Sequence, residues 1–182
     1  MQLKDKIDIK VSFNDIIVKA SAIALSRHQA INSSWMGDSI IEHGDVHIAV
    51  AVAIEEGLMT PVLRHVDQKG LIQISSETRE LAGMARDRKL ASEQMEGSTF
   101  TISNLGMFGI EEFTAIINPP NACILAVGAI RDVPVIENGA VVPGKRMKVT
   151  LSSDHRIVDG AKAADFLNTL RSLIENPLSM LL

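Results

Sequence analysis

Hydrophobic and polar residues alternate with two different periods along this chain, and the change of period separates helices from strands. In residues 12–29, apolar side chains recur every three or four positions from Ile16 to Ala24, which predicts a helix with one buried stripe. Ser12 stands where an N-cap is needed, and Asp15 follows three residues later, near the positive end of the helix dipole. The sequence therefore predicts a capped helix close to the start of the chain.

Two more segments have the helical period. Residues 160–177 predict a final helix, which Pro177 helps to end. Residues 70–90 predict another helix with its charged residues facing outward. The inward positions of that helix are Leu71, Ile74, Thr78, Leu81 and Ala85.

Other segments have the period or the length of β-strands. Residues 46–54 alternate valine or isoleucine with small alanines, which predicts one strand covered on both sides. Asn138 and Gly139 stand between two β-prone runs and predict a tight hairpin. Three further strands are predicted at 98–106, 122–130 and 146–152. Together these elements predict an α/β fold in which helices back a mixed β-sheet.

Composition narrows the class of protein. The chain has 182 residues, of which 46% are hydrophobic and 22% charged, and this suits one globular domain. A net charge of −4 without a basic stripe gives no reason to expect a nucleic-acid partner. We expect no membrane partner either, because no apolar run is long enough to span a bilayer and residues 1–12 contain no signal-peptide core. The single cysteine, Cys123, lies in an apolar run, which predicts a buried, unreactive thiol and favours a reducing compartment.

A charged cluster, "SDHRIVDG" at 153–160, occupies the junction between the last predicted strand and the last helix. Imidazole ordinarily titrates near neutral pH, so His155 is a candidate proton acceptor. Asp159 follows four residues later, and its carboxylate can face either the imidazole or another cation. A structural Asp-Arg cluster that stiffens the turn explains the same residues, so the spacing leaves both interpretations open.

Longer motifs point to a family. "DHRIVDG" at 154–160 and "FTISNLGMFGIEEFTAIINPPNACILAVGAI" at 100–130 resemble the catalytic domain of the dihydrolipoamide acyltransferases, the core components of 2-oxo acid dehydrogenase complexes. "VAIEEGLMTPVLR" at 52–64 and the terminal "NPLSMLL" fit the same family, so the resemblance runs along the chain in order. "SNLGMFGI" and "AIINPPNACILA" are most similar to the acetyl-transferring branch, that of the pyruvate dehydrogenase complex.

The resemblance implies a fold like chloramphenicol acetyltransferase, a two-layer α/β sandwich. It also implies homotrimers that build a cubic or dodecahedral core, with active sites at the trimer interfaces. Dihydrolipoamide would enter each site from one side and coenzyme A from the other, and the acetyl group would pass directly between the two thiols. A bacterial cytoplasm or a mitochondrial matrix would suit such a protein.

Roles for individual residues follow from the same resemblance. The catalytic base falls on His155, and the hydroxyl that stabilises the oxyanion falls on Ser103. Asp159 would either orient the imidazole or pair with an arginine from the N-terminal part of the domain; we expect this chain to begin after that part, which makes Arg156 a candidate substitute. The residues expected to contact the substrates are Asn104, Gly106, Leu58, Thr60 and Pro61.

We interpret residues 1–182 as the catalytic domain without its N-terminal portion. Neither a lipoyl-bearing lysine motif nor a subunit-binding domain is visible. The lipoyl group, and contacts with the decarboxylase and dihydrolipoamide dehydrogenase components, would therefore come from domains outside this chain. Three alternatives stay open: transfer of succinyl or branched-chain acyl groups, a non-catalytic scaffold, and a serine hydrolase. The hydrolase is disfavoured, since no G-x-S-x-G elbow surrounds Ser103.

The segment "EHGDVH" invites a metal-site interpretation, because His43, Asp45 and His47 are close in sequence. Histidines four residues apart share a helix face, but Gly44 and the β alternation that follows argue against a helix. We therefore expect the polar edge of a strand here, and no metal.

Overall fold

The computed structural model describes residues 10–181. Most of residues 1–12, in which we expect no signal peptide, therefore lies outside the described residues. In chain order the helices, strands and short 3₁₀ helices (η) are α1 (Phe13–Arg27), β1 (Ser33–Trp35), β2 (Ile40–Glu42), β3 (Ile48–Val50), β4 (Val52–Ile54), β5 (Gly57–Met59), β6 (Val62–Leu63), η1 (Val66–Gln68), α2 (Leu71–Arg86), η2 (Ser92–Gln94), β7 (Phe100–Asn104), η3 (Gly106–Phe108), β8 (Cys123–Val127), β9 (Arg131–Glu137), β10 (Ala140–Arg146), β11 (Val149–Ser153), α3 (Gly160–Glu175) and η4 (Pro177–Leu181).

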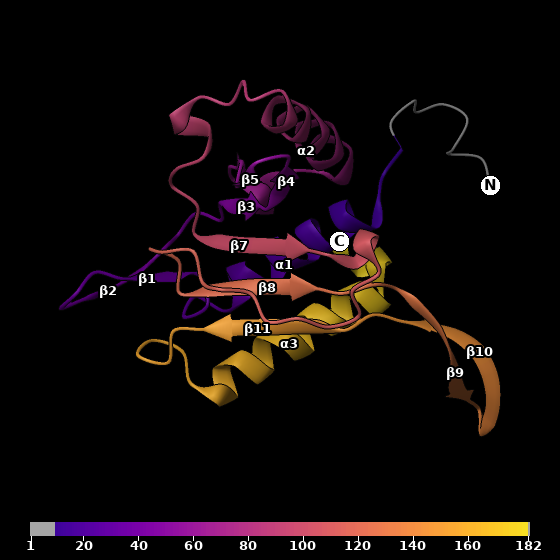
Figure 1. Ribbon diagram of the computed structural model, residues 1–182. Helices are drawn as coiled ribbons and strands as arrows, with labels where there is room; N and C mark the ends of the chain where they lie inside the picture. The colour runs from indigo at the N-terminus through magenta and orange to yellow at the C-terminus, as the bar shows by residue number, and fades with distance from the viewer. Residues whose placement is uncertain (1–9, 182) are drawn as a thin grey trace.

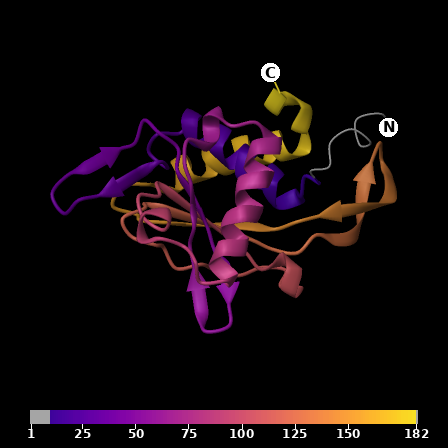
Figure 2. The ribbon, with the colours of Figure 1, turned by 90° about the horizontal axis from the view of Figure 1, so that it is seen from above.

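A five-stranded mixed sheet forms the centre of the fold, in the order β11-β8-β7-β3-β6. The inner pairs β8–β7 and β7–β3 are parallel, whereas the outer pairs are antiparallel. Helices α1 and α3 lie side by side on one face of this sheet (Figures 1 and 2). The predicted α/β sandwich, a mixed sheet backed by helices, is confirmed.

Helix α1 begins as its sequence predicts and supplies much of the core. The Asp15 N–H donates to Ser12 Oγ over 3.3 Å, and the Ser12 N–H donates to Asp15 Oδ2 over 2.7 Å, which completes a capping box. Behind the sheet, Phe166 of α3 meets Phe100 of β7 with 5.8 Å between ring centroids, and both side chains are fully buried. Each large apolar side chain buried this way contributes about 1.5–3 kcal/mol, so the contacts of α1, α3 and the sheet stabilise the scaffold.

The predicted single strand at 46–54 is wrong, because the structure contains two strands that belong to different sheets. β3 lies inside the five-stranded sheet, whereas β4 pairs with β5 in a separate hairpin. The Ala51 N–H still donates to the Ile102 carbonyl over 2.9 Å, and the chain leaves the sheet immediately after it. Ala53 is consequently exposed, although Ala49 is buried.

The hairpin of β9 and β10 is confirmed at its predicted turn. Asn138 and Gly139 have φ values of 51° and 80°, the left-handed conformations that a type I′ turn requires. The hairpin projects away from the body of the molecule (Figures 1 and 2). Arg146 belongs to its second strand, and β11 begins only at Val149, so the predicted strand at 146–152 started too early.

The second face of the sheet is crossed by the chain between η3 and β8 (Figure 1). Along this path the Ser152 hydroxyl donates to the Ala115 carbonyl over 2.7 Å, and the Ala129 N–H donates to the Ile110 carbonyl over 2.8 Å. Helix α2 lies at the β6 edge of the sheet, where it contacts β6 and β4. In the described part of the chain, no helix has both the length and the hydropathy needed to cross a bilayer.

Candidate active site

The turn that carries His155 leads from β11 directly into α3. Backbone hydrogen bonds of Asp154 fix the conformation of this turn. The Asp154 N–H donates to the Ala122 carbonyl over 2.8 Å, and the Asp154 carbonyl accepts from the N–H groups of Ile157 and Val158 over 3.0 Å. Ile157 and Val158 are buried and anchor the turn, whereas His155 is exposed. The turn therefore presents the imidazole on a rigid support, at the end of the sheet where β11 finishes.

Arg156 pairs with Asp154. Its Nε donates to Asp154 Oδ1 over 2.9 Å and its Nη2 donates to Asp154 Oδ2 over 2.6 Å, and these hydrogen bonds lower the pKa of Asp154. The Arg156 guanidinium also lies 4.8 Å from the centre of the Trp35 ring, which is within range of a cation–π contact. The expectation that Arg156 pairs with Asp159 is therefore wrong, because the carboxylate two residues before the arginine offers a two-point contact.

Asp159 is the N-cap of α3. Its Oδ1 accepts from the Lys162 N–H over 3.0 Å, and Lys162 Nζ lies 3.8 Å from Oδ2. The backbone hydrogen bond is the main cause that lowers the pKa of Asp159, and the charge interaction with His155 adds a small part in the same direction. Asp159 therefore starts the helix behind the His155 turn, while its effect on the imidazole itself stays a prediction.

A cavity of about 350 Å³ opens between the β4–β5 hairpin, α2 and the junction of β7 with η3. Its volume is typical of small-molecule sites. Four predicted residues line it, Ser103, Asn104, Leu58 and Pro61, whereas Thr60 and Gly106 are not part of the lining. The other lining residues are Asn14, Val50, Ala51, Val52, Ala53, Leu63, Thr78, Leu81, Ala82, Arg86, Leu105, Met107 and Phe108.

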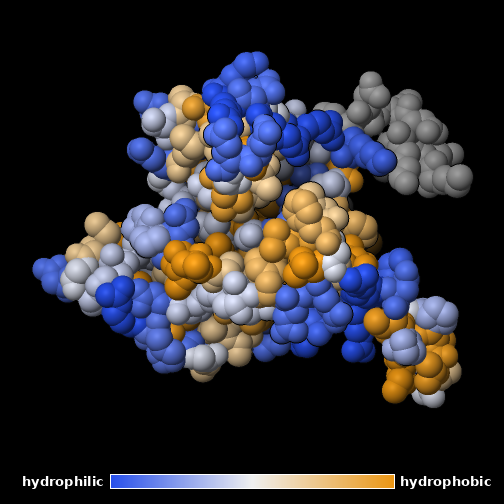
Figure 3. Space-filling view, in the orientation of Figure 1, coloured by the Kyte–Doolittle hydropathy of each residue, from blue (hydrophilic) through white to orange (hydrophobic). Residues whose placement is uncertain are grey.

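The rim of this cavity exposes large apolar side chains. Met107 is 80% and Phe108 is 61% exposed, and Ile116, on the chain that crosses the sheet, is 91% exposed. Hydrophobic surface gathers over this side of the sheet and on the β9–β10 hairpin (Figure 3). Exposed apolar side chains that gather on one surface are typical of binding or subunit-contact sites.

The amide of Asn104 fixes the end of β7. Its Nδ2 donates to Asn14 Oδ1 over 3.2 Å, and its Oδ1 accepts from the Gly106 N–H over 2.8 Å. A Cβ on Gly106 would lie 2.7 Å from the Gly128 carbonyl oxygen and 3.1 Å from Ala129 Cα. In the structure Gly106 therefore allows η3 to pack closely against the end of β8.

Ser103 and His155 lie at opposite ends of the sheet within one chain. Ser103 is level with Ala126 of β8, and Ala126 is level with Thr150 of β11. From Thr150, β11 runs away from the Ser103 end to Ser153, about 10 Å along the strand, and the two strand spacings add about 10 Å sideways. A serine and a histidine from the same chain therefore do not form one site.

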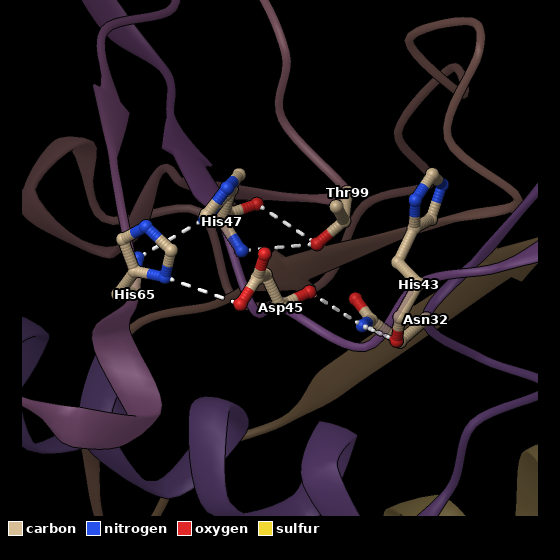
Figure 4. A network of polar contacts seen from close by, with 6 residues as sticks. All are labelled: Asn32, His43, Asp45, His47, His65 and Thr99. Carbon is tan, nitrogen blue, oxygen red and sulfur yellow. Dashed lines mark hydrogen bonds and ion pairs between the residues drawn. The ribbon is translucent and has the colours of Figure 1, made fainter.

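A second polar group lies where β3 and β6 meet (Figure 4). The side chains of Asp45, His47 and His65 place one possible ligand atom each within 4.8 Å of one another. Sequence reasoning missed His65, since no short spacing links it to His47. His43, which the sequence grouped with them, points away and contacts Ser34 Oγ over 2.8 Å.

Cys123 is buried in β8, as predicted. Burial raises the pKa of its thiol to about 11, so almost none of it is thiolate at neutral pH. This cysteine therefore has a packing role.

Comparison with known protein families identifies the chain. The family model for the 2-oxoacid dehydrogenases acyltransferase catalytic domain matches residues 1–182. The chain belongs to this family. The resemblance inferred from the motifs is therefore confirmed.

Among curated relatives, the dihydrolipoyllysine-residue acetyltransferase component of the pyruvate dehydrogenase complex from Rickettsia felis is 48% identical over 173 residues, which cover 95% of this chain and 42% of the relative. The mitochondrial protein of the same name from Schizosaccharomyces pombe is also 48% identical, over 95% of this chain and 36% of its own length. The chain thus spans less than half the length of these relatives.

Solved structures agree with the observed architecture. The cubic core of the pyruvate dehydrogenase multienzyme complex matches with a TM-score of 0.93 at 39% identity, over 98% of this chain and 74% of that one. A chloramphenicol acetyltransferase matches with a TM-score of 0.56 at 15% identity, over 90% of this chain and 78% of that one. The second likeness concerns the fold alone, and it confirms the predicted architecture.

Proposed function

We propose that this chain is a core acyltransferase that moves an acetyl group between dihydrolipoamide and coenzyme A. The observation that carries the proposal is the placement of Ser103 and His155 at opposite ends of one sheet. Two copies packed with these ends together would complete a site from His155 of one copy and Ser103 of the other. A homotrimer provides such an interface three times by symmetry.

A relative supports these residue roles. The crystallographic and enzymatic study of Azotobacter vinelandii dihydrolipoamide acetyltransferase, 38% identical to this chain, concerns a serine, a histidine and an asparagine in the catalytic mechanism. In that protein the histidine follows the serine by 52 positions and the asparagine follows the histidine by four. Ser103, His155 and Asp159 have the same spacing here, with an aspartate in the third position.

His155 acts as the general base. A thiol has an ordinary pKa near 8.5 and an imidazole near 6.5, so the proton transfer is uphill by about 3 kcal/mol. Alignment of thiol and imidazole in a site shielded from water offsets this cost. The thiolate sulfur then attacks the carbonyl carbon of the acyl thioester, and a positioned base of this kind accelerates the reaction by about 10²–10⁴-fold.

The Ser103 hydroxyl donates a hydrogen bond to the tetrahedral oxyanion. When the intermediate collapses, the C–S bond to the departing thiol breaks, and that sulfur takes the proton back from the imidazolium. The acyl group passes from sulfur to sulfur without an acyl-enzyme. Loss of one oxyanion donor costs about 10²–10³-fold in turnover.

The cavity beside Ser103 would receive a thiol substrate. Leu58 and Pro61 on its hairpin side are the residues we assign to the coenzyme A approach, and Asn104 lies beside the reacting serine. The dihydrolipoyl group would arrive on a lipoyl domain outside this chain, as would contacts with the decarboxylase and dihydrolipoamide dehydrogenase components. A cubic or dodecahedral core of trimers, in a bacterial cytoplasm or mitochondrial matrix, is the assembly and setting we expect. The solved cubic core and the bacterial and mitochondrial relatives support it.

An acyl-specificity assay tests the substrate. We would measure transfer to free dihydrolipoamide from acetyl-, succinyl- and branched-chain acyl-coenzyme A under identical conditions. The proposal expects acetyl to be preferred, in line with the names of the relatives. A succinyl or branched-chain preference would assign the chain to a sister complex, and a symmetric assembly without turnover at saturating thiols would indicate a scaffold.

Two variants test the mechanism. His155→Ala should abolish transfer, whereas Ser103→Ala should lower turnover by about 10²–10³-fold with little change in substrate binding. Lys89→Gln, which changes an exposed side chain beyond the end of α2, is the control and should keep full activity. Equal losses in both variants, together with an acylated Ser103 trapped in the unmodified chain, would favour covalent catalysis by a serine hydrolase mechanism.

A further inference from the structure

Asp45, His47 and His65 converge on one point at the edge of the sheet (Figure 4). His65 Nδ1 lies 3.3 Å from Asp45 Oδ1, and His47 Nδ1 accepts from the His65 N–H over 3.0 Å. The two imidazole rings meet edge to face with 4.6 Å between their centroids. Two imidazoles and one carboxylate thus share a single solvent-accessible site, because Asp45 and His65 are about half exposed.

The fold assembles this group from two strands. Asp45 and His47 approach β3, and two residues apart on an extended segment they share one face. In the antiparallel pairing, Ile48 lies opposite Leu63. If this pairing continued, His65 would lie opposite Val46, and its side chain would point to the same side of the sheet as the buried Val46 side chain. His65 instead adopts left-handed backbone angles, φ 47° and ψ 48°, which direct its ring to the face of Asp45 and His47.

The left-handed conformation costs a non-glycine residue about 1 kcal/mol or more, and histidine is among the side chains that adopt it more readily than most. A turn at this point requires only a residue that tolerates positive φ, such as glycine or asparagine. The backbone therefore accommodates the imidazole without requiring it. The ring lies beside two side chains that each offer a possible metal-ligating atom.

We propose that Asp45, His47 and His65 form a three-ligand site for a divalent transition-metal cation of the Zn²⁺ type, which replaces our initial expectation of no metal. A His₂-carboxylate set with a fourth, open position is one that Zn²⁺ accepts in tetrahedral geometry. Ligand atoms bound at 2.0–2.2 Å around a tetrahedral ion lie roughly 3.4 Å apart, close to the observed separation of His65 Nδ1 from Asp45 Oδ1.

The charges around the group tolerate a cation. Arg64, which precedes His65 in the chain, carries a competing positive charge, and its Nη2 donates to the carbonyls of Glu93 and Glu96 over 2.9 and 3.1 Å. A bound ion would join the edge strand β6 to β3 and stabilise the folded chain by an amount that rises with the logarithm of the free-ion concentration above the dissociation constant.

Metal titration of the tag-free, chelator-treated chain tests the site. We would titrate Zn²⁺ against a colorimetric chelator, and titrate Co²⁺ while recording the visible absorption that distinguishes tetrahedral coordination. The expected result is one ion per chain and a rise in melting temperature with Zn²⁺. Loss of an outer-shell partner already costs 10–100-fold in affinity, so His47→Gln and His65→Asn should each weaken binding by at least about 100-fold.

Two further variants make the test decisive. His43→Gln removes the neighbouring histidine that points away from the group, and it should bind Zn²⁺ as the unmodified chain does. Asp45→Asn removes the carboxylate ligand by changing an exposed side chain, and it should also weaken Zn²⁺ binding. It replaces the histidine variants in the test if one of them does not fold. The proposal is overturned if the unmodified chain binds less than a stoichiometric amount of Zn²⁺, or if affinity is unchanged in the His47, His65 and Asp45 variants.

Discussion

The two aspartates that flank His155 have different physical tasks. Asp154 binds Arg156 through both carboxylate oxygens and holds the turn against Trp35. Asp159 caps α3 through the Lys162 N–H. Each task positions the backbone around the imidazole, so both residues are positioning residues in the proposed reaction.

Replacing Asp159 separates capping from an electrostatic role. Asp159→Ala should lower the free energy of unfolding by about 1 kcal/mol, the usual cost of a lost N-cap, whereas Asp159→Asn should stay close to the unmodified chain because asparagine also caps helices. Urea denaturation measures both. If Asp159→Asn is stable but much slower in acetyl transfer, the carboxylate charge acts on the imidazole; the same transfer rate would leave capping as its role.

Asp154 predicts a specific dependence of stability on pH. Its pKa is below the ordinary value of 3.8 in the folded chain, so the pairing with Arg156 stabilises the fold at pH values above 3.8 and is lost as the pH falls through the lower folded value. The stability difference between the unmodified chain and Asp154→Asn should therefore be constant near neutral pH and shrink below about pH 4. Denaturation at a series of pH values measures this, with the exposed Asp132→Asn as control; a difference that persists unchanged at low pH would contradict the assignment.

At the level of elements, the junction of β7 with η3 depends on close backbone packing. A Cβ at Gly106 would meet the Gly128 carbonyl oxygen at 2.7 Å, and that oxygen belongs to a backbone that cannot turn aside. The same junction places Ser103 and Asn104 on the cavity. Packing and the proposed site are therefore coupled through one glycine.

Gly106→Ala should destabilise the fold by about 1–3 kcal/mol, the range for overpacked sites, and it should also reduce transfer because Asn104 loses its place. Gly83→Ala is the matched control, since a Cβ there meets no atom within 4 Å and its helical position in α2 favours alanine by about 0.5–1 kcal/mol. Thermal and urea denaturation of both variants checks the prediction. If Gly106→Ala were as stable as the unmodified chain, the η3 backbone would have to shift to accommodate the added methyl group, and the prediction would be wrong.

For the assembly as a whole, the exposed apolar side chains and the separated site residues point to the same requirement. Met107, Phe108 and Ile116 are large and exposed on one side of the sheet. In the proposed mechanism, Ser103 and His155 meet only across a contact between two copies, because they are far apart within one chain. Assembly of several copies would cover the exposed apolar side chains and would bring Ser103 of one copy to His155 of another.

Complementation tests this directly. His155→Ala and Ser103→Ala chains, each inactive or nearly so alone, should recover activity when refolded together, because about one interface in four then combines an intact histidine with an intact serine. Transfer assays on mixed and separate samples measure the recovery, and light scattering checks that both variants assemble. Mixed samples no more active than the separate variants would place both residues of the site in a single chain.

Local sequence patterns predicted the elements well and their partners less well. The capping box of Ser12 and Asp15, the I′ turn at Asn138 and the start of α3 depend on neighbours within a few residues, and all agree with the structure. Residues 46–54 alternate without a break, yet β3 and β4 join different sheets. Side-chain alternation reports which face is buried and carries no information on which strand pairs with which.

For the site, the sequence motifs supplied the residue types, and contacts between distant segments supplied their arrangement. Ser103, His155 and Asp159 could be named because the motifs that contain them resemble those of the acyltransferase family. Three features could not: the pairing of Arg156 with Asp154 in preference to Asp159, the approach of His65 to Asp45 and His47, and the separation of Ser103 from His155. They follow from turn geometry and strand register, and these are selected by burial of the whole apolar surface of the chain, which no local window of sequence contains.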